Sequence, residues 1–86
     1  MGYRVRLERR AEKELRSLDQ RDRSRVLQAI EALANEPRPN GVKKLKGEAT
    51  VVWRIRVGNF RILYTINDTV LTISVIRVGH RKEIYR

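Results

Sequence analysis

Arg54, Arg56 and Arg61 have the side-chain type and the spacing to bind a polyanion. They fall in two segments of alternating apolar and polar residues on either side of Gly58-Asn59, a pattern that predicts a β-hairpin with a two-residue turn. In such a hairpin Arg56 lies directly opposite Arg61, and paired residues share a face of the sheet. Facing guanidinium groups repel each other, so the pair itself adds nothing to stability. A bound polyanion would relieve the repulsion, and the spacing therefore predicts an anion-binding face.

The same hairpin register sorts the apolar side chains onto the opposite face. The predicted apolar pairs are Val57 with Phe60, Ile55 with Ile62 and Trp53 with Tyr64, whereas Arg54 pairs with Leu63 on the face of the arginines. A shift by one residue would exchange the two faces, because side chains alternate along a strand. We expect the apolar face to pack against helices, with Trp53 and Phe60 as core residues and not as stacking platforms for bases.

Two helices that could cover the apolar face are predicted in the N-terminal half. A short strand over residues 3–7 comes first, and apolar residues then recur at helical spacing over residues 11–18, which gives about three turns. Asp19 is a suitable N-cap for a second helix. The apolar stripe of this second helix consists of Val26, Ala29, Ile30 and Leu33. Pro37 and Pro39 are expected to end it.

The C-terminal half is predicted to complete the sheet. Residues 40–47 form a basic loop, the hairpin follows, and a last strand covers residues 69–78 after a two-residue turn at Asn67-Asp68. That turn would pair Leu71 with Tyr64, Ile73 with Ile62 and Val75 with Phe60. The order β-α-α-β-β-β predicts a two-layer α+β fold, with both N-terminal helices packed on one face of a small, mainly antiparallel sheet.

The length of the chain is that of a single domain, which we expect to span residues 1–86. There is no cysteine, so disulfides, thiolate metal sites and a cysteine nucleophile are excluded. The sequence lacks a nucleotide-binding glycine loop, a metal-ligand cluster and a Ser-His-Asp arrangement, and we expect no cofactor and no metal. No apolar run approaches a membrane span, and the N-terminus lacks the core of a signal peptide. These features indicate a soluble, cytoplasmic protein.

Positive charge is concentrated in the C-terminal half. The formal net charge is +10, from 20 basic and 10 acidic residues. Residues 1–36 contribute 9 basic and 7 acidic side chains, whereas residues 37–86 contribute 11 basic ones and only Glu48, Asp68 and Glu83. Such a field attracts phosphate polymers and steers encounters with them. We expect a nucleic acid and no membrane as partner, because the amphipathic segments are needed to cover the sheet.

Four pieces follow one another along the sequence: Lys44-Leu45-Lys46-Gly47, the hairpin from Trp53 to Tyr64, the segment Val75-Ile76-Arg77-Val78-Gly79-His80-Arg81 and the terminal Tyr85. Taken in this order, they resemble the RelE toxins of the RelE/ParE superfamily. The resemblance covers nearly the whole chain. It implies the toxin of a type II toxin–antitoxin system, a ribosome-dependent endoribonuclease that cuts mRNA in the ribosomal A site. It also implies a cognate RelB-like antitoxin that holds the toxin inactive, with operator DNA bound only through that antitoxin.

The resemblance also implies roles for single residues. Arg54 and Arg56 take positions where some members have lysines, Arg61 that of the transition-state arginine, Arg81 that of the leaving-group arginine, and Tyr85 that of the C-terminal tyrosine. The family's reaction uses the ribose 2′-hydroxyl as nucleophile and needs no metal. Arginine keeps the charge of lysine but exchanges protons less readily, which argues against a lysine-type base here.

Cleavage through the 2′-hydroxyl requires a base, a group that stabilises charge on the phosphorane, and a proton for the departing 5′ oxygen. Arg61 is expected to stabilise the phosphorane, a contribution of about 3 to 4 kcal/mol by analogy with oxyanion holes. Tyr85, with an ordinary pKa of about 10 that neighbouring arginines would lower, and His80, at about 6.5, are the candidate bases. Arg81 suits charge stabilisation of the leaving oxygen better than proton donation.

Contacts to RNA phosphates are expected from Lys43, Lys44, Lys46, Arg54, Arg56, Arg77 and Lys82. Non-catalytic alternatives stay open: Arg61 could be a solvated strand residue or pair with Glu48 or Glu83, Tyr85 could pack or stack, and His80 could be a surface side chain. Two other functions stay open too, a ParE-like inhibitor that binds DNA gyrase without chemistry and a general RNA-binding module. The implied antitoxin should be acidic and present an amphipathic helix or an extended segment.

Overall fold

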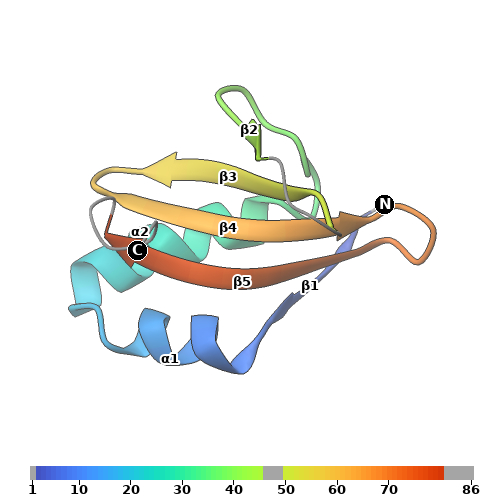
Figure 1. Cartoon of the computed structure of the whole chain (residues 1–86). Helices are drawn as coiled ribbons and strands as arrows, with labels where there is room; N and C mark the ends of the chain where they lie inside the picture. The colour runs from blue at the N-terminus through green and yellow to red at the C-terminus, as the bar shows by residue number, and fades with distance from the viewer. Residues whose placement is uncertain (1, 46–49, 81–86) are drawn as a thin grey trace.

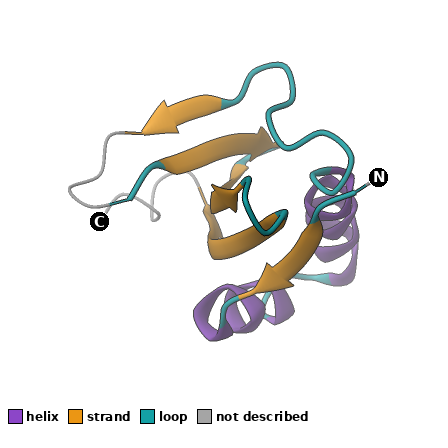
Figure 2. Cartoon of the chain, turned by 90° about the vertical axis from the view of Figure 1, so that its right-hand side faces the viewer, coloured by secondary structure: helices purple, strands orange, loops and turns teal. Residues whose placement is uncertain are grey.

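The computed structural model describes residues 2–45 and 50–80, which form two helices and a five-stranded mixed sheet (Figure 1). The elements in chain order are β1 (Arg4–Leu7), α1 (Arg9–Arg16), α2 (Gln20–Ala32), β2 (Lys43–Leu45), β3 (Val52–Val57), β4 (Phe60–Asn67) and β5 (Thr72–His80). Both helices lie on one side of the sheet (Figure 2). The predicted α+β fold with two helices packed on one face is therefore confirmed.

Helix α1 is shorter than the sequence pattern suggests. It ends at Arg16, and Leu18 packs against the core from the turn that follows. The apolar spacing from Ala11 to Leu18 extends past the helix because this turn keeps Leu18 on the same side. Ala11 and Leu15 are the buried residues of the helix itself.

Helix α2 begins as predicted and ends earlier. The carboxylate of Asp19 accepts a hydrogen bond from the backbone N–H of Asp22 at 2.9 Å, which caps the first turn. The helix ends at Ala32, because the N–H groups of residues 34–36 bond to carbonyls only three or four residues back in an irregular last turn. The expectation that Pro37 and Pro39 end it is wrong.

Strands β3 and β4 form the predicted hairpin in the predicted register. Arg56 pairs with Arg61, Ile55 with Ile62 and Trp53 with Tyr64. Gly58 adopts a φ of 60°, the left-handed conformation that such a two-residue turn requires. The apolar face of the hairpin looks toward the helices. We call the opposite side of the sheet the open face; it carries Arg54, Arg56, Arg61, Leu63 and Thr65.

The stretch predicted as a basic loop contains the short strand β2. Lys43 pairs with Arg54 and Leu45 with Val52 in an antiparallel ladder. The sheet order is β1-β5-β4-β3-β2, and β1 runs parallel to β5. Lysine-rich segments of this length have low strand propensity, so pairing with β3 defines β2.

The predicted register between β4 and β5 is wrong. Asn67 pairs with Thr72, so residues 68–71 form a four-residue loop in place of a two-residue turn. The side chain of Asn67 stabilises this loop, since its Oδ1 accepts hydrogen bonds from the N–H groups of residues 69 and 70 at 3.0 and 3.1 Å. Leu71 was expected to pair with Tyr64 in the core; it lies in the loop with a φ of 51° and is 46% exposed.

A bulge in β5 moves the remaining pairs further. Tyr64 pairs with Val75, but Leu63 pairs with Arg77, which leaves Ile76 as the extra residue. Ile62 therefore lies opposite Val78 instead of Ile73, and Phe60 lies opposite His80 instead of Val75. Ile73 and Val75 are nevertheless fully buried. They keep the predicted face because the pairing before the bulge shifts by an even number of residues.

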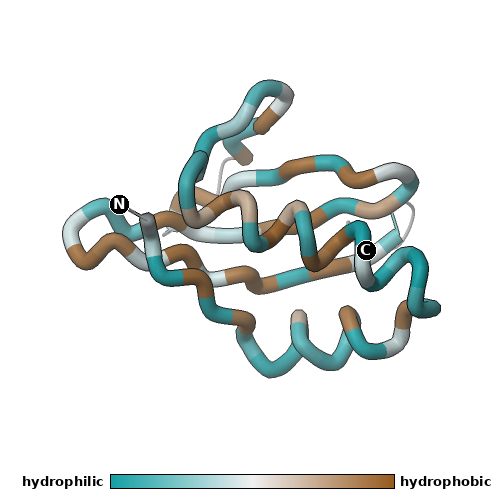
Figure 3. Tube along the Cα trace, turned by 180° about the vertical axis from the view of Figure 1, so that it is seen from behind, coloured by the Kyte–Doolittle hydropathy of each residue, from teal (hydrophilic) through white to brown (hydrophobic). Residues whose placement is uncertain are grey.

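The core lies between the two helices and the face of the sheet that they cover, and apolar and polar residues alternate along α2 (Figure 3). Tyr64 is fully buried, and its hydroxyl donates to the carbonyl oxygen of Pro37 at 2.7 Å. This bond ties the segment after α2 to the centre of the sheet. Burial raises the pKa of Tyr64 to about 12. Within the described residues, no helix is long and apolar enough to cross a membrane.

Candidate functional site

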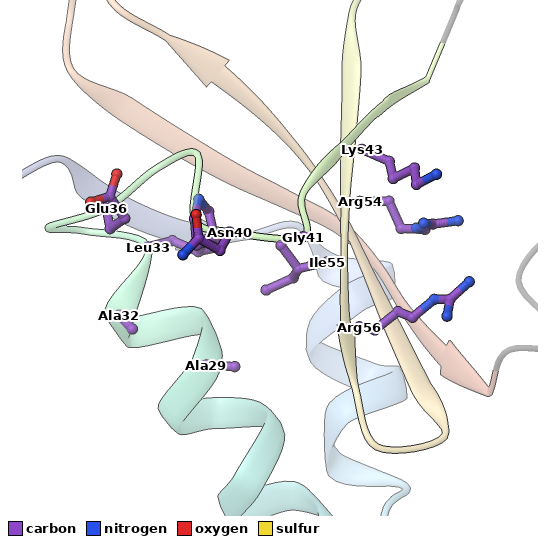
Figure 4. Close-up of a pocket in the computed structure, with 11 residues that line it drawn as sticks. Ala29, Ala32, Leu33, Glu36, Asn40, Gly41, Lys43, Arg54, Ile55 and Arg56 are labelled. Atoms are coloured by element: carbon purple, nitrogen blue, oxygen red, sulfur yellow. The ribbon is translucent and has the colours of Figure 1, made fainter.

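Arg54, Arg56 and Arg61, the arginine cluster, share the open face. The register pairs Arg56 directly with Arg61, and Arg54 lies two residues away from Arg56 on β3. In Figure 4 the side chains of Arg54 and Arg56 extend in one direction, and Ile55 extends toward α2. The sequence analysis predicted this juxtaposition, because a two-residue turn leaves the hairpin one register.

The three guanidinium groups differ in exposure. Arg54 is only 8% exposed, Arg61 is half-buried and Arg56 is exposed. Arg54 lies between its strand partners, Lys43 on β2 and Leu63 on β4. Packing on both sides restricts the side chain of Arg54 and orients it, while Arg56 at the surface is available to an incoming anion.

Gly79 lies opposite Arg61 on the neighbouring strand β5. A side chain at this position would lie beside the Arg61 guanidinium on the open face, since cross-strand partners are the closest neighbours in a sheet. As a glycine, Gly79 places no side chain of its own beside Arg61. The sequence analysis missed this contact because it depends on the bulge that shifts the β5 register.

Among the described residues of the C-terminal half, acidic groups are scarce near the cluster, although Glu36 lines the same hollow as Arg54 and Arg56. None of the described strands contains Asp or Glu, and Asp68 is the single acid within residues 37–45 and 50–80. Asp68 is already engaged, since Arg38 donates to it at 2.9 Å and the Tyr3 hydroxyl at 2.6 Å. These two hydrogen bonds lower the pKa of Asp68. The described strands therefore bring only positive charge to the open face.

The two described lysines of the predicted loop point to different sides of the sheet. Lys43 pairs with Arg54 and extends on the same side as Arg54 and Arg56 (Figure 4). Lys44 pairs with Trp53, and its Nζ lies 6.0 Å from the centre of the Trp53 ring, which Arg38 also contacts at 5.0 Å. Lys43 thus joins the arginine cluster, and Lys44 contributes to packing around Trp53. Lys46 lies outside the described residues.

Arg77 is held by helix α1. Its Nε donates to Glu14 Oε2 at 3.1 Å, and the other carboxylate oxygen accepts from the N–H of Val78 at 2.9 Å. Glu14 occupies the edge of β5 beyond the end of β1, where Val78 pairs with Ile62 on one side and, among the described residues, has no strand on the other. The side chains of Arg77 and Glu14 are only 18% and 24% exposed. Arg77 therefore connects α1 to the sheet and does not belong to the arginine cluster.

His80 is separated from the arginine cluster by the sheet. Its ring meets that of Phe60 edge-on, with 5.8 Å between the ring centres and an angle of 77°. Phe60 packs against the core on the helix side of the sheet. A small hollow there is lined by Phe60 and His80 together with Ser17 and Leu18. Arg81, Lys82 and Tyr85, the other expected site residues of the tail, lie outside the described residues.

A hollow of about 560 Å³ separates α2 from the outer edge of β3 (Figure 4). Ala29, Ala32 and Leu33 form its helix wall, and Ile55 and Arg56 its strand wall. Strand β2 pairs with β3 only as far as Arg54, so among the described residues no strand covers the edge beyond it. Its lining combines apolar side chains with three cations, Lys43, Arg54 and Arg56, and one acid, Glu36. The described residues include no group of three or more His, Asp or Glu that could hold a metal ion.

Comparisons with known proteins place the chain in a family. The profile of the ParE toxin of type II toxin–antitoxin systems (parDE) matches residues 5–85. The toxin RelG of Mycobacterium tuberculosis is 37% identical over 87 residues, covering all of this chain and 99% of that protein. In the archaeal RelE–RelB complex from Pyrococcus horikoshii, a chain with 30% identity superposes with a TM-score of 0.83, covering 96% of this chain and 99% of the other.

The toxin–antitoxin complex RelBE2 of Mycobacterium tuberculosis gives a similar result, with 32% identity, a TM-score of 0.82 and coverage of 94% and 100% of the two chains. Profile, sequence and structure agree over almost the full length. The chain therefore belongs to the RelE/ParE family of toxins from type II toxin–antitoxin systems.

Proposed function

We propose that this toxin is a ribosome-dependent mRNA endoribonuclease that cleaves RNA through the ribose 2′-hydroxyl and needs no metal. The observation that carries the proposal is the arginine cluster. Arg56 and Arg61 are paired on the adjacent strands β3 and β4, and Arg61 is also paired with Gly79 on β5. Like charges at this distance are unfavourable in the free protein, and a phosphodiester between them removes the repulsion.

The chemistry requires charge stabilisation above all. The 2′-oxygen attacks the adjacent phosphorus and forms an O–P bond, the bond from phosphorus to the 5′ oxygen breaks, and the products are a 2′,3′-cyclic phosphate and a free 5′-hydroxyl. Negative charge builds on the two non-bridging oxygens in between. Arg61 and Arg56 are suited to bind those oxygens, and Arg54, ordered by packing, supports the position of the RNA.

Proton transfer is assigned to the tail. The 2′-hydroxyl loses a proton to the deprotonated form of Tyr85. Arg81 stabilises the charge on the leaving 5′ oxygen, and water supplies the proton that this oxygen takes up. His80 is the weaker candidate, because its ring contacts Phe60 on the helix side. Of the RNA-binding candidates, Lys43 has the most direct support, since it extends beside Arg54. The set of acids and bases is sparse, so the ribosome has to position the substrate.

The partner that controls the toxin is an antitoxin. Two of the similar structures are described as complexes of a RelE-type toxin with its antitoxin. We expect an acidic antitoxin segment to occupy the hollow between α2 and β3, because its lining combines apolar side chains with Lys43, Arg54 and Arg56. The exposed backbone of β3 beyond Arg54 could then pair with the segment. Contact with operator DNA is expected only through the antitoxin.

A ParE-like inhibitor of DNA gyrase is the second candidate, because the matching family profile bears the ParE name. The two functions make opposite predictions for the cluster. An inhibitor that acts by binding needs no charge stabilisation at a phosphorus, and it leaves mRNA on ribosomes intact.

The test compares Arg61→Ala with Arg21→Ala in an mRNA cleavage assay on programmed ribosomes. Both changes remove one positive charge, but Arg21 is exposed on α2, away from the open face. Loss of one preorganised donor should reduce the rate of cleavage by about 100-fold to 1000-fold in Arg61→Ala and leave Arg21→Ala close to wild type. Equal activity of the two variants, or gyrase inhibition by a wild-type protein that leaves mRNA uncut, would overturn the proposal.

A further inference from the structure

We propose that the RNA-binding surface of this toxin extends across the whole open face to Arg4 and Arg6 on β1, which bind phosphates away from the cleaved bond. The inference rests on the proposed function, in that the ligand is single-stranded RNA. It adds a second group of contacts, remote from the arginine cluster and from the tail.

The pairing of β1, β5 and β4 places Arg4 and Arg6 on the open face. Thr65 on β4 shares the open face with Arg61, four residues before it, because side chains alternate along the strand. Thr65 pairs with Ser74 on β5, and Ser74 pairs with Arg6 on β1. Paired residues share a face, so a continuous path leads from Arg61 to Arg6 on one side of the sheet. Arg4, paired with Thr72, lies on the same side.

A hollow of about 570 Å³ lies along this path. Arg6 lines it together with the hydroxyl side chains of Thr50, Thr65, Thr72 and Ser74. Hydroxyls of this kind donate to phosphate oxygens and exchange hydrogen bonds with ribose hydroxyls, and the arginine supplies a fixed positive charge. The hollow thus offers the groups that bind a sugar–phosphate backbone.

Arg4 and Arg6 are available for such contacts. Both are exposed, and neither forms a side-chain hydrogen bond or ion pair with another residue in the part of the chain that the structure describes. Asp68, the acid among the lining residues of the hollow, is held by Arg38 and Tyr3. Its charge is largely offset by Arg38, so the hollow remains attractive to anions.

The dimensions favour a nucleic-acid strand. Arg6 and Arg61 are separated by about 10 Å across two strand spacings and by about 13 Å along β4. One phosphate cannot bridge that separation, whereas an RNA strand of several nucleotides can. An amphipathic peptide is the less suitable ligand, because the hollow at Arg6 is lined by five hydroxyl-bearing residues and by only two apolar ones, Ile66 and Val70.

The experiment measures binding of fluorescein-labelled oligouridylate by anisotropy over a range of salt concentrations. The variant Arg4→Ala/Arg6→Ala is compared with Arg9→Ala/Arg21→Ala, which removes the same charge from exposed helix positions. A short oligonucleotide that reaches only the arginine cluster and a longer one that spans the face are both used. Circular dichroism verifies that each variant folds, and Arg6→Lys tests whether charge alone restores binding.

The proposal predicts an affinity loss of about tenfold for the long oligonucleotide in Arg4→Ala/Arg6→Ala, with the slope of log affinity against log salt smaller by about 1.4, the equivalent of two phosphates. The short oligonucleotide and the helix variant should show no such loss, and Arg6→Lys should retain most of the affinity. Equal losses in the β1 and helix variants would overturn the proposal. So would a β1 variant that binds RNA normally and loses affinity only for an acidic peptide.

Failure of the proposed function gives a different pattern. If the toxin does not cleave mRNA, Arg61→Ala and wild type will be equally inactive on ribosomes, while the dependence of RNA affinity on Arg4 and Arg6 can still be measured. If only the extension is wrong, cleavage will depend on Arg61 and the β1 variant will bind the long RNA like wild type.

Discussion

At the scale of single residues, the strand partners of the arginine cluster determine how far each of its side chains is buried. Arg54 is oriented by burial between Lys43 and Leu63, and Arg56 is exposed. Arg61 has Gly79 as its partner on β5. Under the proposed function, Arg54 is fixed by packing, and Arg56 and Arg61 bind the phosphate.

Gly79→Val should reduce mRNA cleavage while preserving the fold. A β-branched side chain is favourable in a strand, but at this position it would lie beside the guanidinium of Arg61 and restrict access to it. We expect the cleavage rate on ribosomes to fall at least tenfold with an unchanged melting temperature. A Gly79→Val protein with full activity would show that the open side of Arg61 is not used.

Tyr64 makes stability fall in alkali. Its folded-state pKa is raised to about 12 by burial, whereas an unfolded tyrosine titrates near 10. Between these two pH values the unfolded chain releases a proton that the folded chain retains. The contribution of Tyr64 to the free energy of unfolding is therefore complete below a pH of about 10 and is lost as the pH rises toward 12.

Urea unfolding at several alkaline pH values measures this effect, with Tyr64→Phe as the comparison. The variant loses the hydrogen bond to the carbonyl of Pro37, about 1 kcal/mol at neutral pH. It should lose less stability than wild type on going to high pH. Identical pH profiles for the two proteins would mean that Tyr64 is not the group responsible.

At the scale of elements, the hairpin and the last strand show what local sequence can predict. The turn at Gly58-Asn59 allows one register, and the observed pairs of β3 and β4 match the predicted ones. The β4–β5 connection combines a loop, organised by the side chain of Asn67, with a bulge at Ile76. Neither has a signal in the alternation of apolar residues, so the predicted pairs of β5 were shifted.

The site residues also divide into those that the sequence could place and those that it could not. Arg54, Arg56 and Arg61 could be placed on one face from the hairpin alone. The positions of Gly79, Arg77 and His80 could not, because they follow the bulge. The separation of Lys43 from Lys44 depends on β2, a strand of three residues that exists through pairing with β3.

The hollow between α2 and β3 makes a prediction about control of the toxin. Ala32→Glu places an acid on the wall of the hollow, where it should repel an acidic antitoxin segment. We expect its affinity for the antitoxin to fall at least tenfold while its cleavage activity is retained.

Ser24→Glu is the matched control, since it adds the same charge to an exposed position two turns earlier on α2. Binding is measured by titration calorimetry. Equal affinities for Ala32→Glu and Ser24→Glu would place the antitoxin elsewhere on the surface.

At the scale of the whole molecule, the fold separates two tasks. The helices and one face of the sheet form the core, and the described strands carry basic side chains without any acidic ones. The open face can therefore hold a polyanion without disturbing the packing that stabilises the protein. The net charge of +10 should make association with ribosomes and with RNA strongly dependent on salt.

The most direct test of the central claim uses ribosomes programmed with an mRNA that carries a single 2′-deoxy nucleotide on the 5′ side of the cleaved bond. Without the 2′-hydroxyl there is no internal nucleophile for the arginine cluster to assist. The account predicts cleavage of the all-ribose message to a 2′,3′-cyclic phosphate and no cleavage of the substituted one at that bond. Cutting of both messages at the same position would contradict it.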